Sequence, residues 1–270
     1  MKKKLLSAYR MLRNQGPTHF ARVLVTLVQP KANMMQLKAK IYMKGANKVV
    51  QLDRCRVALA KLPNTSMKLE LLNGGYEKPE REAVLRFIQP EWGVIELGAC
   101  IGVVACVTNK LLKNPANHVV LEINPLVMPH LISNRDANGC TFQIIDKALA
   151  YDAETVTFSP WMNFWGNSLY QDGSQPPVTV KTTTLADILR DRQFEKFALI
   201  CDIEGQEYEM VMREPETVEK AELIIMEMHP GLLGEDKVKR MISKLEELHF
   251  KIVEQSSNVI TLRKADLAMS

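Results

Sequence analysis

The strongest pattern in the chain is an alternation of short apolar runs with amphipathic segments that begins at Gly93. The apolar runs predict strands at residues 93–97, 118–122, 141–145, 197–202, 222–228, 249–254 and 258–263. The segments between them predict helices at residues 101–113, 125–137, 184–192, 206–213 and 235–248. Such alternation indicates an α/β fold with a mainly parallel sheet covered on both faces. A tight turn at residues 256–258 makes the last two strands an antiparallel hairpin.

The region before Tyr76 has a different pattern. Residues 4–14 predict an imperfect amphipathic helix, and residues 37–44 alternate strictly, which is typical of a half-buried strand. Residues 67–72 alternate less cleanly and are interpreted as a further strand. A helix with proline in its first turn is then expected over residues 79–88. We therefore divide the chain into a β-rich N-terminal extension, residues 1–75, and a main domain, residues 76–270.

The charge of the chain is unevenly distributed. The net charge is +4, but residues 1–61 contain 14 Lys and Arg against one acid, Asp53, and so carry about +13, which leaves about −9 on the rest. The basic segment could pack as a solvated face on the acidic domain, contact an anionic membrane surface or bind another polyanion. Nucleic acid is the less favoured partner, because no Asn-Pro-Pro-Tyr-like base-holding tetrad is present. The oligomeric state cannot be inferred from these patterns.

Cysteine usage and hydropathy indicate the compartment. The five cysteines are scattered without a Cys-x-x-Cys pair, which suits reduced thiols. No apolar run approaches the ~18 residues that cross a bilayer, and no convincing signal-peptide cleavage site follows the basic start. We expect a cytoplasmic protein, with peripheral contact to an anionic membrane through residues 1–61 as an alternative.

The first candidate site is the glycine turn in GVIELGACIG, residues 93–102. Small residues after a strand let the backbone approach a nucleotide closely, although they also serve tight packing of a helix on a strand. A dinucleotide fingerprint would have glycine where Cys100 stands, so a ligand without pyrophosphate, such as S-adenosylmethionine, fits better. In that interpretation Glu96 reaches toward the methionine portion and Gly98 passes under the ligand. Glu122, which ends the next strand, would accept both ribose hydroxyls.

The second candidate site is a group of acids at two later strand ends. Asp202, Glu204 and Glu207 follow one apolar strand, where ligands of open α/β sheets bind. Glu227 and His229 follow the next strand and would join them if the two strands are neighbours. An imidazole beside carboxylates is typical of a general base whose pKa is raised toward neutrality.

Other interpretations of the acidic group stay open. Glu207 could simply stabilise the start of a helix, and His229 could be a structural histidine. The same side chains could ligate a divalent metal, although we predict no metal site. No comparable group of acids is expected around the remaining histidines, His19, His118, His130 and His249.

Several motifs together resemble the FkbM-type methyltransferases, which are S-adenosylmethionine-dependent enzymes of the Rossmann-like, seven-stranded class I. The resemblance covers roughly residues 76–255 and rests on ELGACIG, LEINP, IIDKALAYD, TTTLADIL, CDIEGQEYEMV and MEMHP. The Asp-x-Glu-Gly-x-Glu element is the most specific of these. The family usually has Asp where Glu96 stands and often Asn or His where Cys100 stands, so this chain departs from its pattern at two positions of the cofactor loop.

The resemblance implies roles for individual residues. The cofactor-binding residues carried over are Glu96, Gly98, Ala99, Gly102, Glu122, Asp146, Lys147, Ala148 and Asp202, with Glu122 at the ribose and residues 146–148 at the adenine. The acidic motif is carried over onto Asp202, Glu204, Gly205 and Glu207. The resemblance also implies methyl transfer to a hydroxyl oxygen, often on a sugar or a polyketide.

We therefore predict an O-methyltransferase for a sugar, glycan, glycolipid or polyketide-like small molecule. His229, or else Asp202, is the expected base, and Glu204 completes the catalytic group. An insertion at residues 151–180 reads as a functional loop in which Trp161, Trp165 and Asn167 shape the acceptor pocket. The alternatives are a nucleotide-dependent oxidoreductase, which the missing glycine and the lack of a Tyr-x-x-x-Lys pair disfavour, and a non-catalytic module that binds membrane or polyanion through its basic arm.

Overall fold

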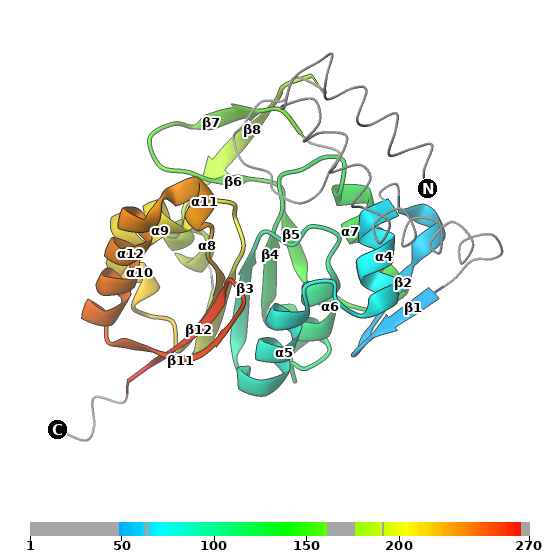
Figure 1. Cartoon of the computed structure of the whole chain (residues 1–270), viewed down its shortest axis with the longest axis horizontal. Coiled ribbons are helices and arrows are strands. Elements are labelled where there is room, and N and C mark those ends of the chain that lie inside the picture. The colour runs from blue at the N-terminus through cyan, green and yellow to red at the C-terminus, as the bar shows by residue number, and fades with distance from the viewer. Residues whose placement is uncertain (1–48, 63–64, 161–175, 191, 266–270) are drawn as a thin grey trace, which may run out of the picture. The chain divides into compact units, whose positions relative to one another are not determined.

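A computed structural model describes residues 49–62, 65–160, 176–190 and 192–265 (Figure 1). Several predictions lie outside the described residues: the amphipathic helix at 4–14, the strand at 37–44, and the pocket residues Trp161, Trp165 and Asn167. Within the part of the chain that the structure describes, no helix has both the length and the apolar character needed to cross a membrane.

A seven-stranded sheet forms the centre of the molecule and confirms the predicted fold class. Its strands are β3 (Gly93–Leu97), β4 (His118–Leu121), β5 (Gln143–Ile145), β9 (Phe197–Cys201), β10 (Leu223–Glu227), β11 (Phe250–Ser256) and β12 (Val259–Lys264). They are arranged in the order β11-β12-β10-β9-β3-β4-β5. The pairs from β10 to β5 are parallel, and β12 is antiparallel to both of its neighbours. All seven predicted strands are therefore confirmed, including the C-terminal hairpin.

The order of the strands creates a crevice beside β3. The chain passes from β3 to β4 on one side and later returns to place β9 on the other side, so the two connections leave the sheet in opposite directions. Ligands of open α/β sheets bind at such a switch point, outside the carboxyl ends of the strands. The register pairs Leu97 of β3 with Cys201 of β9. The loops that follow these two strands consequently start side by side.

Helices cover each face of the sheet and give it two apolar cores (Figure 1). One face packs against α5 (Lys78–Phe87), α6 (Val103–Asn109) and α7 (Met128–Ala137). The other packs against α8 (Leu185–Arg190), α9 (Glu207–Arg213), α10 (Pro215–Val218) and α12 (Glu235–Glu247). Strands β3 and β9 are buried along their whole length, as expected for a sheet covered on both faces. The helices predicted from residue 79 onward are confirmed, and Pro79 lies in the first turn of α5.

Residues 49–75 pack with the main domain. A short antiparallel hairpin of β1 (Val49–Leu52) and β2 (Cys55–Ala58) is followed by a 3-10 turn (Leu59–Lys61) and then by α4 (Thr65–Asn73). The strand predicted at 67–72 is wrong, because this segment belongs to α4. Met67 and Leu71, four residues apart, are both buried on one helix face, and this spacing outweighs the short alternation around Lys68 and Glu70. Val49 to Ser270 forms one compact unit, whereas the sequence places residues 49–75 in the N-terminal extension.

A small second sheet contains part of the predicted loop at 151–180. Its strands β6 (Ala148–Leu149), β7 (Thr155–Phe158) and β8 (Val178–Thr183) have the order β6-β8-β7. The loop prediction is wrong for β7 and β8, where alternating Thr and Val residues favour an extended hairpin. Residues of β6 and β7 reach the crevice beside β3, so this sheet contributes to the site described below.

Candidate active site

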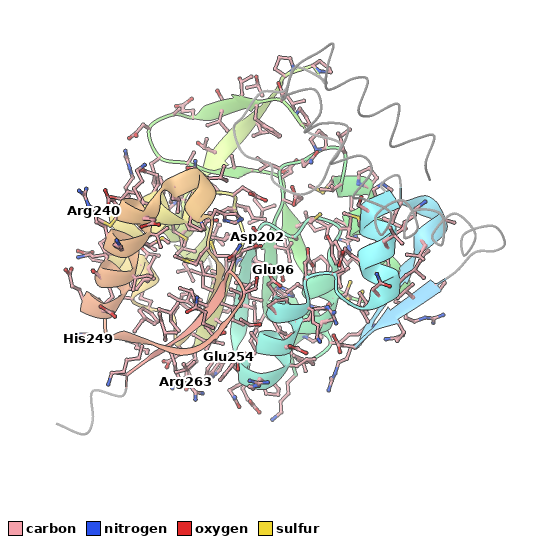
Figure 2. All side chains as sticks on the ribbon, viewed as in Figure 1. Glu96, Asp202, Arg240, His249, Glu254 and Arg263 are labelled. Atoms are coloured by element: carbon pink, nitrogen blue, oxygen red, sulfur yellow. The ribbon has the colours of Figure 1, made fainter. Side chains whose placement is uncertain are left out.

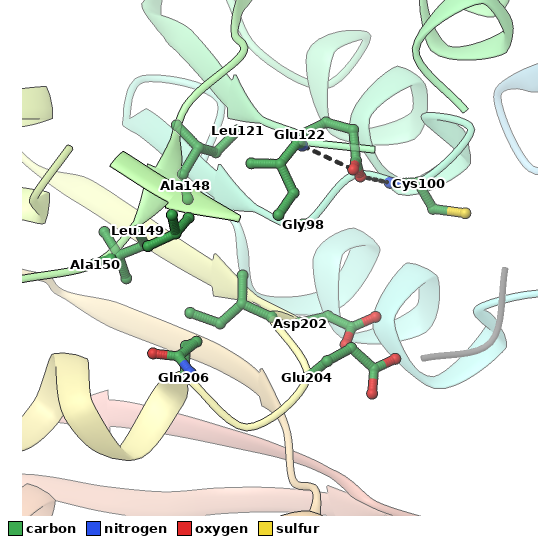
Figure 3. Close-up of a pocket in the computed structure, with 13 residues that line it drawn as sticks. Gly98, Cys100, Leu121, Glu122, Ala148, Leu149, Ala150, Asp202, Glu204 and Gln206 are labelled. Carbon is green, nitrogen blue, oxygen red and sulfur yellow. Dashed lines mark hydrogen bonds between the residues drawn. The ribbon is translucent and has the colours of Figure 1, made fainter. Parts of the chain in front are cut away.

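A pocket opens at the carboxyl ends of β3, β4 and β9 (Figure 3). Its wall combines small and aliphatic side chains with three carboxylates. The lining residues are Gly98, Cys100, Leu121, Glu122, Ile123, Ala148, Leu149, Ala150, Val156, Asp202, Ile203, Glu204 and Gln206. Of the predicted cofactor residues, Gly98, Glu122, Ala148 and Asp202 are brought together here.

Gly98 holds the loops after β3 and β9 in direct backbone contact. Its φ is +84°, and a Cβ atom built on it would lie 1.7 Å from the carbonyl oxygen of Asp202. No side chain fits at that distance, and the left-handed backbone also favours glycine. Gly98 N–H donates to the Leu121 carbonyl oxygen at 2.9 Å, which joins the same turn to β4. Gly98 is therefore needed to assemble the pocket as well as to line it.

Gly102, which the resemblance implies as a cofactor residue, lies where α6 begins and close to α7. It precedes α6 with φ +79°, and a Cβ atom there would lie 2.4 Å from Leu131 Cδ1 on α7. Neither Gly102 nor Ala99 lines the pocket. The alternative considered for the glycine turn was tight packing of a helix on a strand; at Gly102 the close contact is with a residue of helix α7 instead.

Glu122 is a buried carboxylate clasped by backbone N–H groups. Oε2 accepts a hydrogen bond from Cys100 N–H at 2.7 Å (Figure 3). Oε1 accepts hydrogen bonds from Ile123 N–H at 2.8 Å and from Asn124 N–H at 2.7 Å. Burial raises the pKa of Glu122, while these N–H donors oppose the rise. Oε1 accepts two of these hydrogen bonds, whereas Oε2 accepts one and keeps acceptor capacity. Because Glu122 lines the pocket, its carboxylate is positioned to accept a further hydrogen bond from a ligand hydroxyl.

Glu96 does not line the pocket but forms a buried pair with His118 (Glu96 is labelled in Figure 2). Oε2 of Glu96 lies 3.2 Å from Nε2 of His118, and both side chains are almost fully buried. The expectation that His118 lacks an acidic neighbour is wrong. Parallel pairing of Val94 with His118 places Glu96, two residues further along β3, on the same face of the sheet. The sequence predicts both strands, but the contact follows only from their register, which the structure supplies.

The apolar side of the pocket comes from the small sheet and from β4. Ala148 lines it together with its neighbours Leu149 and Ala150, whereas Asp146 and Lys147 are exposed and lie outside the lining. The residues that the sequence missed are Leu121, Ile123, Leu149, Ala150, Val156, Ile203 and Gln206. Leu121, Ile123 and Ile203 lie at or directly after the end of a predicted strand, and that position was the available signal for them.

The neighbouring strands β9 and β10 bring the predicted acids and His229 together. Parallel pairing between these strands is confirmed, with Met226 opposite Cys201. Nε2 of His229 lies 3.4 Å from Asp202 Oδ1 and 3.4 Å from Glu204 Oε2. The imidazole is mostly buried, and Asp202 and Glu204 both line the pocket. The group is therefore continuous with the pocket that contains Glu122.

Glu207 contacts both His229 and the loop after β9. Its side chain is fully buried, and Oε1 lies 3.0 Å from Nδ1 of His229. The same carboxylate accepts hydrogen bonds from Ile203 N–H at 3.1 Å and Gly205 N–H at 2.8 Å. Stabilisation of a helix start, the simpler interpretation of Glu207, leaves the contact with His229 unexplained.

Burial and mutual repulsion raise the pKa values of the acids in this mouth. Burial raises the pKa of Asp202 well above its usual value, and the charges of Glu227 and Glu204 add to the rise. Burial likewise raises the pKa of Glu204 and of Glu227, although the charge of His229 opposes both shifts. Burial lowers the pKa of His229, but its hydrogen bond to Glu207 and the surrounding carboxylates outweigh that effect, and the pKa is raised overall.

Two acids at the start of α5, which the sequence did not suggest, belong to the same electrostatic environment. Burial raises the pKa of Glu80 to about 7, and the charge of Glu227 contributes to the rise. Burial and the charge of Glu80 also raise the pKa of Glu77, the residue that precedes the helix. The sequence did not suggest these two acids because they do not follow a predicted strand. The local pattern of α5 also does not show that its acids lie near the carboxyl ends of the strands.

The acids also raise the question of a metal ion. One ligand atom from each of Asp202, Glu207 and His229 lies within 4.8 Å of the other two. Carboxylate and imidazole donors suit divalent cations. However, the oxygens of Glu207 already interact with two backbone N–H groups and with Nδ1 of His229. Glu207 is therefore better suited to hold its neighbours in place than to ligate an ion.

Comparisons with known proteins agree with this geometry. The family model described as the methyltransferase FkbM domain matches residues 96–252. The hexuronic acid methyltransferase AglP of Haloferax volcanii is 24% identical over 159 residues, which cover 56% of this chain. The chain spans only 64% of the length of that curated relative.

Solved structures also align with the chain. The ribosomal protein L11 methylase from Lactobacillus delbrueckii subsp. bulgaricus covers 80% of this chain and 99% of its own, with 13% identity and a TM-score of 0.43. The M. jannaschii TYW2 structure, in complex with AdoMet, covers 82% of this chain and 85% of its own, with 12% identity and a TM-score of 0.40.

Proposed function

The chain belongs to the methyltransferase FkbM domain family, and from this premise we propose that it transfers a methyl group to a hydroxyl oxygen of a sugar, glycan, glycolipid or polyketide-like small molecule. Methyl transfer is the activity of the family, and S-adenosylmethionine is the methyl donor. Membership in this family sets aside the oxidoreductase alternative. The observation that carries the proposal is the continuity of the Glu122 pocket with the group formed by Asp202, Glu204 and His229.

The residues of the pocket fit S-adenosylmethionine. Glu122 offers buried carboxylate oxygens for ribose hydroxyls, and Ala148, Leu149 and Ala150 offer an apolar wall for the adenine. Gly98 and the acids at the end of β9 would face the methionine portion. When bound, S-adenosylmethionine supplies an electrophilic methyl group on a sulfonium sulfur.

His229 is the group of this chain best placed to remove the hydroxyl proton. A hydroxyl is a poor nucleophile, and a base in hydrogen-bond reach strengthens it as it attacks. Nε2 of His229 points toward Asp202 and Glu204, both of which line the pocket. Those two carboxyl groups can orient the acceptor hydroxyl and share its proton. Asp202 is the alternative base.

The electrostatics of the mouth favour an uncharged acceptor group. Asp202, Glu204 and Glu227 repel one another, and an acceptor carboxylate brought to His229 would add to that repulsion. AglP is named for a hexuronic acid, which carries both hydroxyls and a carboxyl group, and this supports a sugar acceptor. We propose that a hydroxyl rather than the carboxylate receives the methyl group.

Radiolabelled methyl transfer from S-adenosylmethionine tests the proposal. The full chain is incubated with neutral sugars, hexuronic acids, glycolipids and polyketide-like alcohols, and labelled products are treated with mild base. A base-stable methyl ether is expected, whereas release of the label as methanol would show ester formation on a carboxylate. Label confined to protein or nucleic acid would refute the small-molecule acceptor, and binding without transfer to any acceptor would favour the non-catalytic module.

A further inference from the structure

We propose that Glu207 is a positioning residue that fixes the tautomer and orientation of His229 and ties it to the loop bearing Asp202 and Glu204. The inference rests on the proposed function for its catalytic meaning. The contacts of Glu207 with His229 and with the loop after β9 lie within this chain, so their effect on the His229 tautomer can be tested without an acceptor.

The contact between Glu207 and His229 is made where water is excluded. Oε1 of Glu207 lies 3.0 Å from Nδ1 of His229, and the Glu207 side chain is fully buried. A carboxylate accepts hydrogen bonds, so Nδ1 must carry the proton of this contact. In the neutral imidazole, Nε2 is then the nitrogen with the lone pair.

The orientation that follows directs the basic nitrogen toward two side chains that line the pocket. Nε2 faces Asp202 Oδ1 and Glu204 Oε2, each at 3.4 Å, which is long for a hydrogen bond. Asp202 Oδ1 is buried and has no hydrogen-bond partner among the described residues. An acceptor hydroxyl placed among these three atoms would satisfy groups that the protein leaves unpaired. The Nε2–H tautomer would instead present a donor, and the imidazole could not accept the hydroxyl proton.

Glu207 also connects the base to the loop after β9. Its carboxylate accepts hydrogen bonds from Ile203 N–H and Gly205 N–H, on either side of Glu204. Glu204 has φ +52° and Gly205 has φ +100°, so this loop follows a path that few residues adopt without support. One buried carboxylate therefore holds the loop and the imidazole in a single arrangement.

The charged surroundings of His229 come from four parts of the chain. Asp202, Glu204 and Glu207 belong to the loop after β9 and to α9, Glu227 ends β10, and Glu80 lies on α5. All are acids, and all favour the protonated imidazole. Among them, Glu207 is the one that makes a hydrogen bond to the ring.

Long-range 1H–15N spectra of the full chain test the tautomer in the wild-type protein. His229 is assigned as the resonance missing from the His229→Gln variant. The neutral ring is expected to be the Nδ1–H tautomer. The Nε2–H tautomer would overturn the proposal whether or not any acceptor is ever found, and even if every Glu207 variant failed to fold.

Two variants then separate positioning from mere structural support. Glu207→Gln keeps the side-chain shape but removes the charge, so the pKa of His229 should fall by about 1 or more. The rise of kcat with pH, which follows deprotonation of His229, should shift to lower pH by the same amount. Glu207→Asp keeps the charge, so the pKa of His229 should fall less in this variant than in Glu207→Gln.

Glu209→Gln is the matched control. Glu209 lies on the same helix, pairs with Arg213 and lines no part of the pocket. This control should leave both the pKa of His229 and the pH profile unchanged. An unchanged His229 pKa in folded Glu207→Gln would overturn the proposal. If the pKa moves but no sugar or alcohol is methylated by the wild type, the proposed function fails and the positioning role stands.

Discussion

The backbone N–H of Cys100 donates a 2.7 Å hydrogen bond to Oε2 of Glu122, which joins the turn after β3 to the end of β4. Cys100 has φ +48°, so the turn adopts a left-handed conformation at a residue other than glycine. The contact helps to compensate for that conformation, since a charged acceptor strengthens the bond. Glu122 therefore shapes the glycine turn in addition to lining the pocket.

Replacing Glu122 should weaken binding of S-adenosylmethionine. Glu122→Ala removes the acceptor of three backbone N–H groups together with the proposed ribose contact. We expect the Kd for S-adenosylmethionine to rise about 10- to 100-fold, which corresponds to about 1.4 to 2.8 kcal/mol of binding free energy. Glu122→Gln is the matched control, because its carbonyl oxygen retains part of this acceptor capacity, and it should bind with intermediate affinity. Isothermal titration calorimetry measures both. An unchanged Kd in Glu122→Ala would rule out the ribose role.

Gly98→Ala should destabilise the fold and abolish cofactor binding. The added Cβ would lie 1.7 Å from the Asp202 carbonyl oxygen, so the loops after β3 and β9 would have to separate. Gly139→Ala provides the control, because Gly139 has φ +64° but no atom within 4 Å of the new Cβ. Its cost should be limited to the backbone conformation, about 1 kcal/mol. Thermal unfolding of both variants checks the difference, and equal Tm losses would contradict the importance of the contact.

His229→Ala should reduce turnover about 10²- to 10⁴-fold while leaving cofactor affinity nearly unchanged, because the imidazole is the proposed base and lies outside the pocket lining. In the wild type, kcat should rise with pH as the imidazole loses its proton. The raised pKa of His229 places this rise above its usual value of about 6.5. Rate profiles across a range of about pH 5 to 9 test this point. A profile in His229→Ala identical to that of the wild type would transfer the role to Asp202.

Glu80→Gln should stabilise the protein increasingly as pH rises. Burial raises the pKa of Glu80 to about 7, so between its unfolded value near 4.5 and pH 7 the folded state holds a proton that the unfolded state has lost. Folding stability contributed by this group is thus present at low pH and is lost as pH rises through that window. The full effect is about 3 kcal/mol. The Tm difference between variant and wild type should be larger at about pH 8 than at about pH 5, and a difference independent of pH would contradict the raised pKa.

Chelation tests the prediction that methyl transfer needs no metal. With the oxygens of Glu207 engaged by N–H groups and by the imidazole, we expect turnover to persist after dialysis against EDTA. Added Mg²⁺ or Mn²⁺ should leave kcat unchanged. Loss of activity on chelation, restored by one of these ions, would instead assign Asp202 and His229 as ligands.

Much of the architecture could be predicted because it depends on local patterns. The apolar runs of β3 and β9 identify buried strands wherever they occur, and the parallel order brings Asp202 and His229 to neighbouring strand ends. The sequence misassigned α4 because a short alternating run fits a strand about as well as a helix. Only the burial of Met67 and Leu71 on one face decides between them.

The rest of the site depends on contacts between distant elements. Glu80 reaches the acids of β9 and β10 from a helix whose orientation is set by packing. The role of Gly102 emerges only when α7 is placed beside it, since Leu131 is what a side chain there would strike. The pairing of Glu96 with His118 depends on strand register, which one sequence does not specify.

The pairing of Phe158 with Val178 closes a β-hairpin at the point where β7 and β8 part. Because backbone pairing sets the register of β7 and β8 up to these two residues, the point at which the strands part is fixed within the sheet. Ala148 and Leu149, which line the pocket, belong to β6 on the other side of β8. For protein engineering, Phe158 and Val178 are therefore defined junctions, at which a segment from a related family member could be joined without changing the register of this sheet.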